Sequence, residues 1–156
     1  MNLRRFIPVA VLGVLLYAGG TAQAASTLTV VTDLSFGSFG LMDNNTPQTI
    51  IVTPASDVTY GIKVVDGPTP PVAGEYLLEG LTPDTLLDIS IDDTTISPSG
   101  GGSPDFTIST FTTNNPTTNS SGNATLLVGA TLTTSGTGVH YESDHYTGTM
   151  NITIIF

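Results

Sequence analysis

Both histidines of the chain lie in one short polar segment, His140-Tyr-Glu-Ser-Asp-His145. Zinc and copper prefer imidazole and carboxylate ligands, so His140 and His145 are candidate metal ligands. Their spacing matches no standard zinc motif, and the sequence supplies no clear third ligand. The alternative is a polar turn between two strands whose side chains face water. We predict no bound cofactor.

A second set of candidate ligands consists of acidic side chains in the middle of the chain. Calcium prefers carboxylate oxygens, which makes Asp92 and Asp93 candidate ligands together with Asp88. On a strand, Asp88 and Asp92 would lie about 13 Å apart, too far to share one ion without a bend. A solvated sheet face ending in an Asp-Asp turn explains the same pattern. The loop Asp43-Asn44-Asn45 is another candidate calcium site.

The sequence contains no recognisable catalytic constellation. Cys is absent, which excludes thiol catalysis and thiolate metal sites. Hydroxyl side chains are abundant, but the sequence contains no nucleophile-elbow motif that would indicate a catalytic serine. Trp is absent, and both Arg residues lie at the extreme N-terminus, so the groups that commonly position a substrate are missing from the rest of the chain. Paired carboxylates leave glycoside hydrolysis open, but we predict that the protein is not an enzyme.

Four tyrosines suggest a different function, the stacking of a sugar ring. Exposed aromatic side chains would form such a platform, and the candidates are Tyr60, Tyr76, Tyr141 and Tyr146. Packing in the core or at a sheet edge is the commoner role of a tyrosine in a strand.

The first residues have the features of a secretory signal. Arg4-Arg5 forms a positive start, Phe6–Tyr17 is apolar, and Ala22-Gln23-Ala24 is an A-x-A cleavage site. A membrane anchor is the alternative, but the apolar run is too short to span a bilayer comfortably. We therefore predict a cleaved signal over residues 1–24 and a single domain over 25–156. The domain would be exported to the periplasm, the cell surface or the medium, without insertion into a membrane.

Cleavage would leave a strongly acidic domain. Residues 25–156 hold all thirteen acids and a single cation, Lys63, which gives a net charge of −12. Binding to nucleic acid needs clustered cations, and anionic membrane surfaces repel such a chain. The charge therefore excludes nucleic acid as a partner.

The composition predicts an all-β fold. The chain is rich in Thr, which favours strands, and no segment shows the i, i+3, i+4, i+7 apolar pattern of a helix. Alternating apolar residues recur between turn signals roughly every 8–12 residues, as in an antiparallel β-sandwich or barrel of about eight or nine strands. The expected strands cover residues 28–36, 48–53, 58–65, 75–79, 86–92, 105–111, 124–134 and 145–156.

The last two strands form the predicted centre of the sheet. Ala124–Thr134 and His145–Phe156 are joined by a short segment, and we expect the closing strand to pair with Leu126–Leu132. An unpaired apolar strand is an aggregation template, so the closing strand must be paired inside the domain or inside an assembly. One face of the closing strand is wholly apolar and is predicted to lie in the core: Met150, Ile152, Ile154 and Phe156. Ile155, on the opposite face, is a candidate partner contact.

Three short elements follow one another in a recognisable order: Asp33-Leu-Ser-Phe-Gly37, Leu127-Val-Gly-Ala-Thr-Leu132, and Tyr146-Thr-Gly148 with the alternation that follows it. Together they resemble a bacterial secreted family, the domain of unknown function 4402. The resemblance covers essentially the whole chain after the leader and is loosest over 97–122. The positions expected to serve structure or assembly are Leu34, Phe36, Gly37, Val128, Gly129, Tyr146, Gly148, Ile152, Ile154 and Phe156.

That family is similar to fimbrial subunits of the chaperone–usher kind and to spore-coat-U-like domains. The resemblance implies an immunoglobulin-like, pilin-like sandwich and a non-enzymatic structural or adhesive role in a surface fibre or coat. Its partners would be further copies or related subunits, a periplasmic chaperone and an usher. A monomeric module that binds carbohydrate or calcium is the alternative function.

Two features depart from a pilin. The usual cysteine pair is absent, and only Ala25-Ser26-Thr27 precedes the first strand, which is too short for a separate donor strand. If strands were exchanged between chains, Leu28–Phe36 itself would have to be the donor.

Overall fold

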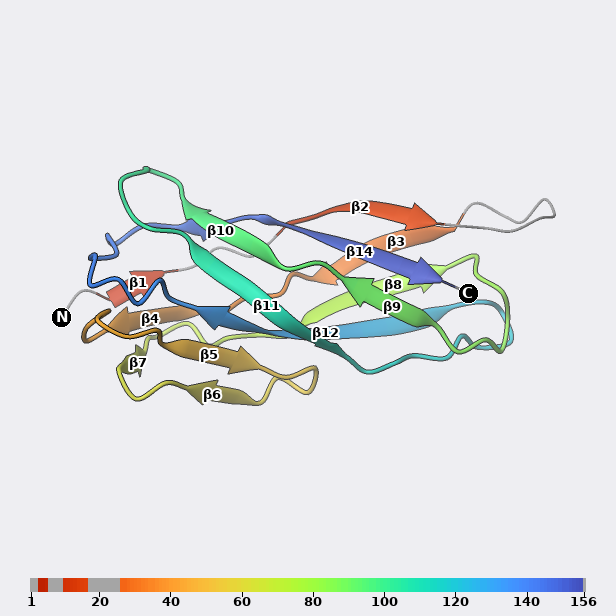
Figure 1. The fold of residues 1–156 in the computed structure, drawn as a ribbon. Coiled ribbons are helices and arrows are strands. Elements are labelled where there is room, and N and C mark those ends of the chain that lie inside the picture. Colours follow the sequence, from red (N-terminus) through yellow and green to blue (C-terminus); the bar gives the residue numbers. More distant parts are fainter. Residues whose placement is uncertain (1–2, 6–9, 17–25, 156) are drawn as a thin grey trace.

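Strands account for all the regular structure in a computed structural model of the chain, which describes residues 3–5, 10–16 and 26–155 (Figure 1). These ranges contain no helix, and so none that could span a membrane. All strand pairs within 26–155 are antiparallel. The all-β, antiparallel sandwich predicted from Thr content and alternation is therefore confirmed.

Twelve strands lie within residues 26–155: β3 (Thr27–Thr32), β4 (Ser38–Leu41), β5 (Thr49–Val52), β6 (Val58–Tyr60), β7 (Val64–Asp66), β8 (Gly74–Glu79), β9 (Asp88–Ile91), β10 (Thr94–Pro98), β11 (Phe106–Thr113), β12 (Ala124–Thr133), β13 (Tyr146–Thr147) and β14 (Thr149–Ile155). Two further strands, β1 (Leu3–Arg5) and β2 (Ala10–Leu16), lie in the predicted leader. The number exceeds the predicted eight or nine because two expected strands are divided and because β4 and β10 lie outside the expected strands. Residues 58–65, for example, turn at Gly61 and become β6 and β7.

The long strand β12 organises the main sheet. It pairs with β11 along one edge. Its other edge pairs first with β8, through Ala124–Val128, and then with β5, through Ala130–Thr133. Gly129 stands at this fork, where a Cβ atom would collide with the carbonyl oxygen of Val52. The glycine is needed because the backbone of β5 approaches β12 too closely for any side chain.

The closing strand lies in the opposite layer and does not pair with β12. β14 pairs with β9, with Ile152 opposite Ile91 and Ile154 opposite Ile89. The prediction that it pairs with Leu126–Leu132 is therefore wrong. Both strands are apolar on one face, and alternation reports only that face, not the neighbour. β12 instead finds its partners in β11, β8 and β5.

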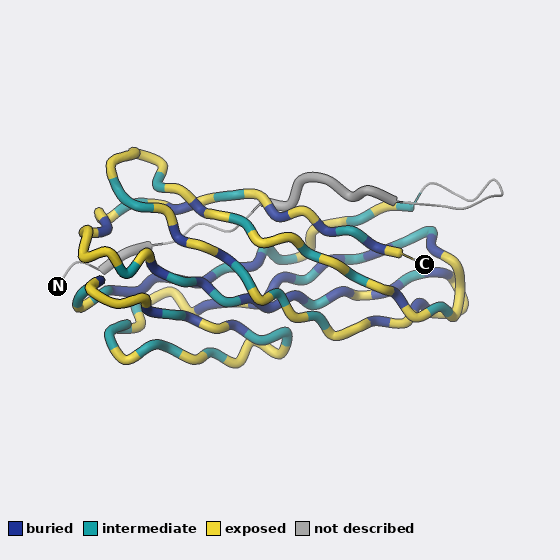
Figure 2. Tube along the Cα trace, viewed as in Figure 1, coloured by how far each residue is buried: buried dark blue, intermediate teal, exposed yellow. Residues whose placement is uncertain are grey.

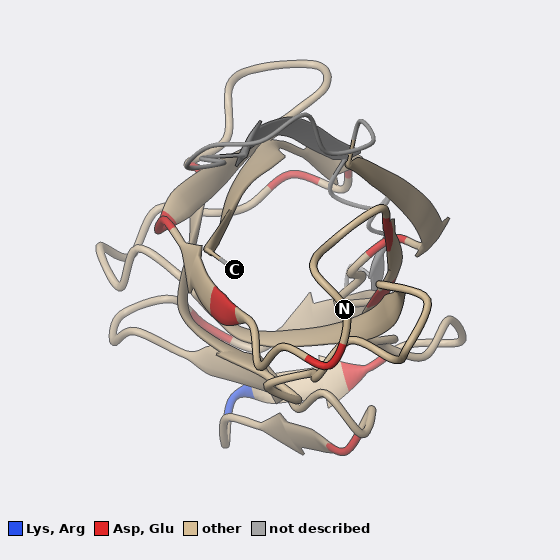
Figure 3. Cartoon of the chain, turned by 90° about the vertical axis from the view of Figure 1, so that its right-hand side faces the viewer, with Lys and Arg blue, Asp and Glu red and all other residues tan. Residues whose placement is uncertain are grey.

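The two layers are joined by one continuous ribbon. The chain runs from β9 through Asp92-Asp93 into β10, which pairs with both β11 and β13. Gly148 separates β13 from β14, and a Cβ atom there would meet the carbonyl oxygen of Thr95. The ribbon can therefore change layers at this point, which curls the sandwich (Figure 3).

The core lies between the layers, with buried residues alternating along the strands (Figure 2). Leu126, Val128 and Leu132 of β12 are fully buried. β9 shows the expected wet face, with Asp88 and Ser90 exposed. Leu34 and Phe36 are buried at the first motif, where Gly37 takes a φ of 67°. A side chain at Gly37 would also meet the carbonyl oxygen of Thr69.

An aromatic cluster fills one end of the core. Phe106 stacks on Tyr141 with ring centroids 4.1 Å apart and meets Tyr146 edge-on at 4.7 Å. The Tyr141 hydroxyl accepts from the Ser135 N–H at 2.8 Å and donates to the Asp105 carbonyl at 3.1 Å. Tyr76 is also buried, so the core alternative holds for these tyrosines and they form no exposed sugar platform.

Candidate functional site

The closing strand β14 has one face in the core and one in solvent. Met150, Ile152 and Ile154 are at most 1% exposed, which confirms their predicted burial. Ile155 is 53% exposed on the opposite face, as expected. Phe156, predicted for the core, lies outside the described residues.

The edge of β14 away from β9 is the most distinctive feature of the molecule. The Asn151 carbonyl accepts from the Asp92 N–H on the β9 side. Because backbone groups alternate in direction along a strand, those of Met150, Ile152 and Ile154 point to the other edge. No strand within residues 26–155 pairs with that edge. In this structure the edge is therefore free of partners from residues 26–155.

In the full chain this edge is filled by β2, which runs parallel to β14 (Figure 1). Ala10 stands opposite Thr149, Val14 opposite Ile152 and Leu16 opposite Ile154. The register shifts between Met150 and Ile152, so that Leu12-Gly13 faces the single residue Asn151. The strand that completes this layer therefore comes from the segment that the sequence predicts to be removed.

A second edge is filled in the same way. β4 pairs with β7 on one side and with β1 on the other, where Arg4 stands opposite Phe39 and Arg5 opposite Ser38. No strand of residues 26–155 takes the place of β1. The predicted leader thus occupies two separate strand edges of the sandwich.

The histidine segment, residues 140–145, lies in the loop before β13 and is hydrogen-bonded to the loop that follows β10. The N–H groups of Gly100 and His145 donate to the Asp144 carboxylate at 2.6 and 2.7 Å, and these bonds lower the pKa of Asp144. The Ser99 N–H donates to the His145 carbonyl at 2.8 Å. His140 and His145 are both exposed. The hydrogen bonds give this segment a structural role through its backbone and Asp144.

The other predicted metal ligands are also solvent-exposed. Asp92 and Asp93 lie in the short link between β9 and β10 and are both exposed. Within the part of the chain that the structure describes, no three His, Asp or Glu side chains come together as a metal site would require.

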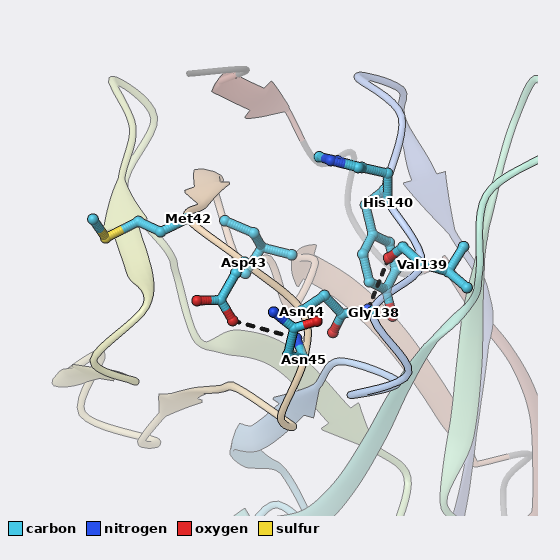
Figure 4. Close-up of a pocket in the computed structure, with 9 residues that line it drawn as sticks. Met42, Asp43, Asn44, Asn45, Gly138, Val139 and His140 are labelled. Carbon is cyan, nitrogen blue, oxygen red and sulfur yellow. Dashed lines mark hydrogen bonds between the residues drawn. The ribbon is translucent and has the colours of Figure 1, made fainter.

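A pocket of about 280 Å³ lies between the loop after β4 and the loop before β13 (Figure 4). Its lining residues are Leu41, Met42, Asp43, Asn44, Asn45, Gly138, Val139, His140 and Tyr141. Asn44 ties the two loops together, because its Nδ2 donates to the Ser135 hydroxyl and the Val139 carbonyl at 2.9 Å, and its Oδ1 accepts from the Gly136 N–H at 3.0 Å. Asp43 is paired with Lys63 at 3.3 Å. The Asn44 amide and the Asp43 carboxylate therefore already have partners within the protein.

Tyr76 makes the fold sensitive to alkali. Burial raises the pKa of Tyr76 to about 12 from its ordinary value of 10.0. A phenol with a higher pKa in the folded chain leaves stability unchanged below about pH 10, and stability falls as the pH rises toward 12. We expect urea unfolding to show this loss, and Tyr76→Phe to remove most of it. An equal loss in Tyr76→Phe would contradict the assignment.

Sequence reasoning found the apolar face of β14 but missed the two strand edges that the leader fills. An edge depends on which strands pair, and no local pattern in the sequence reports this. The one available signal was that the apolar leader segment is long enough to form a strand.

Comparison with known families gives one match. The sequence model of the family described as a domain of unknown function (DUF4402) matches residues 26–156. This range begins just after the predicted leader and includes all three motif elements. Comparison with curated proteins and with solved structures gave no match.

Proposed function

Because the chain belongs to the DUF4402 family, a secreted family by the resemblance described above, we propose that it is a non-enzymatic structural or adhesive protein of the cell surface. It would act as a subunit of a fibre or coat and assemble by β-strand pairing. The domain would be exported after removal of residues 1–24. Its partners would be related subunits or further copies, with a periplasmic chaperone and an usher in its delivery.

The observation that supports this proposal is the edge of β14. After cleavage of the leader, the backbone groups of Met150, Ile152 and Ile154 on that edge have no strand partner within residues 26–155. These three residues also carry the core side chains of the layer. An unpaired edge beside an apolar core is a template for another strand, and backbone groups left unpaired away from water are costly. A strand from another chain would satisfy both requirements.

Assembly can be tested on the chain recovered from exporting cells. Intact mass should show a start at Ala25, and sizing with negative-stain microscopy should show oligomers, fibres or a complex with a second protein. A chain that stays strictly monomeric at high concentration, and is isolated without a bound partner, would contradict the proposal. The variant Asn151→Asp, on the exposed face of β14, serves as a control, because it should leave strand pairing at the edge intact.

The pocket favours a second candidate function, the binding of a carbohydrate. It combines apolar surface from Met42 and Val139 with the amide of Asn45 and the imidazole of His140 at its rim (Figure 4). Calcium fits less well, because the Asp43 carboxylate is paired with Lys63 and the Asn44 amide is used within the protein. Calorimetric titration with neutral sugars and with calcium separates these ligands, and no heat with either would remove this candidate.

A further inference from the structure

We propose that the strand which completes the mature domain belongs to a different protein, and that it carries a basic segment followed by an apolar one. This segment would lie along the β4 edge with its basic residues and then run parallel to β14 with its apolar residues. The inference rests on the proposed function, because it names the partner that strand pairing would recruit.

The two edges that the leader fills, one on β4 and one on β14, are arranged so that one continuous peptide can pair with both. In the full chain a stretch of fourteen residues, Leu3–Leu16, pairs with β4 first and then with β14. Leu3 stands opposite Gly40, and Leu16 stands opposite Ile154. The order of the two edges fixes the direction of the occupant. Its amino-terminal part must lie on β4 and its carboxyl-terminal part on β14.

The chemistry of the two edges differs. The β14 edge receives Ala10–Leu16, which contains no polar side chain, and it accommodates a bulge at Leu12-Gly13. The β4 edge receives Arg4-Arg5. The segment that fills both edges therefore begins with a basic part, Arg4-Arg5, which we call the basic head. Four residues later it continues with an apolar part, Ala10–Leu16.

The charge of the domain favours a basic head. Residues 25–156 carry a net charge of −12, and acidic residues are spread around the whole circumference of the sandwich (Figure 3). The single cation, Lys63, is already paired with Asp43 at 3.3 Å. A cationic segment would therefore be attracted to the domain, and more strongly at low ionic strength.

A second mature copy cannot supply this segment. Residues 25–156 contain one Lys and no Arg, so they hold no basic pair ahead of an apolar run. The strand that exchange between copies would use, β3, pairs with β8 in its own chain, where Leu28 stands opposite Leu78. The composition of the chain thus points to a partner of different sequence.

The test uses the chain recovered after export, with its leader removed, and three synthetic peptides that carry a polyethylene-glycol tail for solubility. The first has the sequence of residues 3–16. The second has Arg4→Gln and Arg5→Gln. The third is methylated at the backbone nitrogens of residues 10–16. Calorimetry gives the affinity, and hydrogen exchange with mass spectrometry reports which strands become protected.

We expect the first peptide to bind one-to-one and to slow exchange in both β4 and β14. The second should bind about tenfold more weakly at low salt and match the first at high salt, because the loss is electrostatic. The third should leave β14 unprotected, since N-methylation removes the N–H donors that pairing with β14 needs.

Other outcomes separate this inference from the proposed function. Two results would show that the partner needs no basic segment on β4: equal affinity of the first two peptides at low salt, or protection of β14 without β4. Either result would overturn this inference and leave the proposed assembly by strand pairing intact. Homo-oligomers that exclude every peptide would show that the partner is a second copy, which overturns the inference and supports the proposed function. A peptide-insensitive monomer with slow exchange throughout β14 would overturn both.

Discussion

The variant Ile152→Asp is expected not to fold. Ile152 is 1% exposed on β14, where it stands opposite Ile91 of β9. A carboxylate at this position would be buried without a compensating cation, and such burial costs several kcal/mol, a large part of the roughly 5–15 kcal/mol that stabilises a domain. Circular dichroism and thermal melting of the exported chain measure the effect. Ile154→Asp should behave in the same way.

Asn151→Asp is the matched control, because it adds the same charge one residue away on the exposed face. It should melt within a few degrees of the unmodified chain. A soluble Ile152→Asp variant with unchanged melting would show that β14 is not an integral strand of the sandwich, and the proposed assembly edge would lose its basis.

The variant Gly129→Ala is expected to lower the free energy of unfolding by about 3 kcal/mol or more. The added methyl group would collide with the Val52 carbonyl and with backbone atoms of Thr53 and Pro54. These are backbone atoms at the end of β5, and they cannot move without separating β5 from β12. Urea unfolding at neutral pH measures the loss.

Gly100→Ala is a suitable control for this variant. Gly100 is exposed, and the nearest atom to a Cβ there is Oδ2 of the Asp144 side chain, at 3.0 Å, which can shift. Its effect should be well under that of Gly129→Ala. Equal effects at the two positions would mean that the fork in the main sheet does not depend on a close backbone approach.

Much of the fold could be predicted from local patterns. Alternation predicted the buried face of β14 and the exposed face of β9, because core-facing and solvent-facing side chains alternate along a strand. The glycines of the motif elements were also informative. Gly37, Gly129 and Gly148 each stand where a neighbouring backbone carbonyl leaves no room for a side chain.

The pairing of strands could not be predicted in the same way. β12 and β14 have similar apolar faces, so pairing them with each other was plausible, yet they lie in opposite layers. β10 was missed because Thr94-Thr95-Ile96 is short and directly follows the acidic pair Asp92-Asp93. Its strand character comes from pairing with β11 and β13, which are distant in sequence.

The candidate sites show the same contrast between what residue types indicate and what strand pairing determines. The residue types of His140, His145, Asp92 and Asp93 suit a metal, but the structure places all four in exposed segments between strands. The assembly edge has no distinctive residue of its own. It is defined by what pairs with β14, and in the full chain that is a segment with the marks of a cleaved leader.

The most direct test of the account is hydrogen exchange across β14 in the exported chain, compared with β12 as an internal reference. The account predicts that amides of Met150, Ile152 and Ile154 exchange quickly in any isolated monomer and slowly once a partner strand is bound, while those of β12 are slow in both states. Amides of Met150, Ile152 and Ile154 that are as slow as those of β12 in a free monomer would show that the edge is already closed, and would contradict assembly by strand pairing.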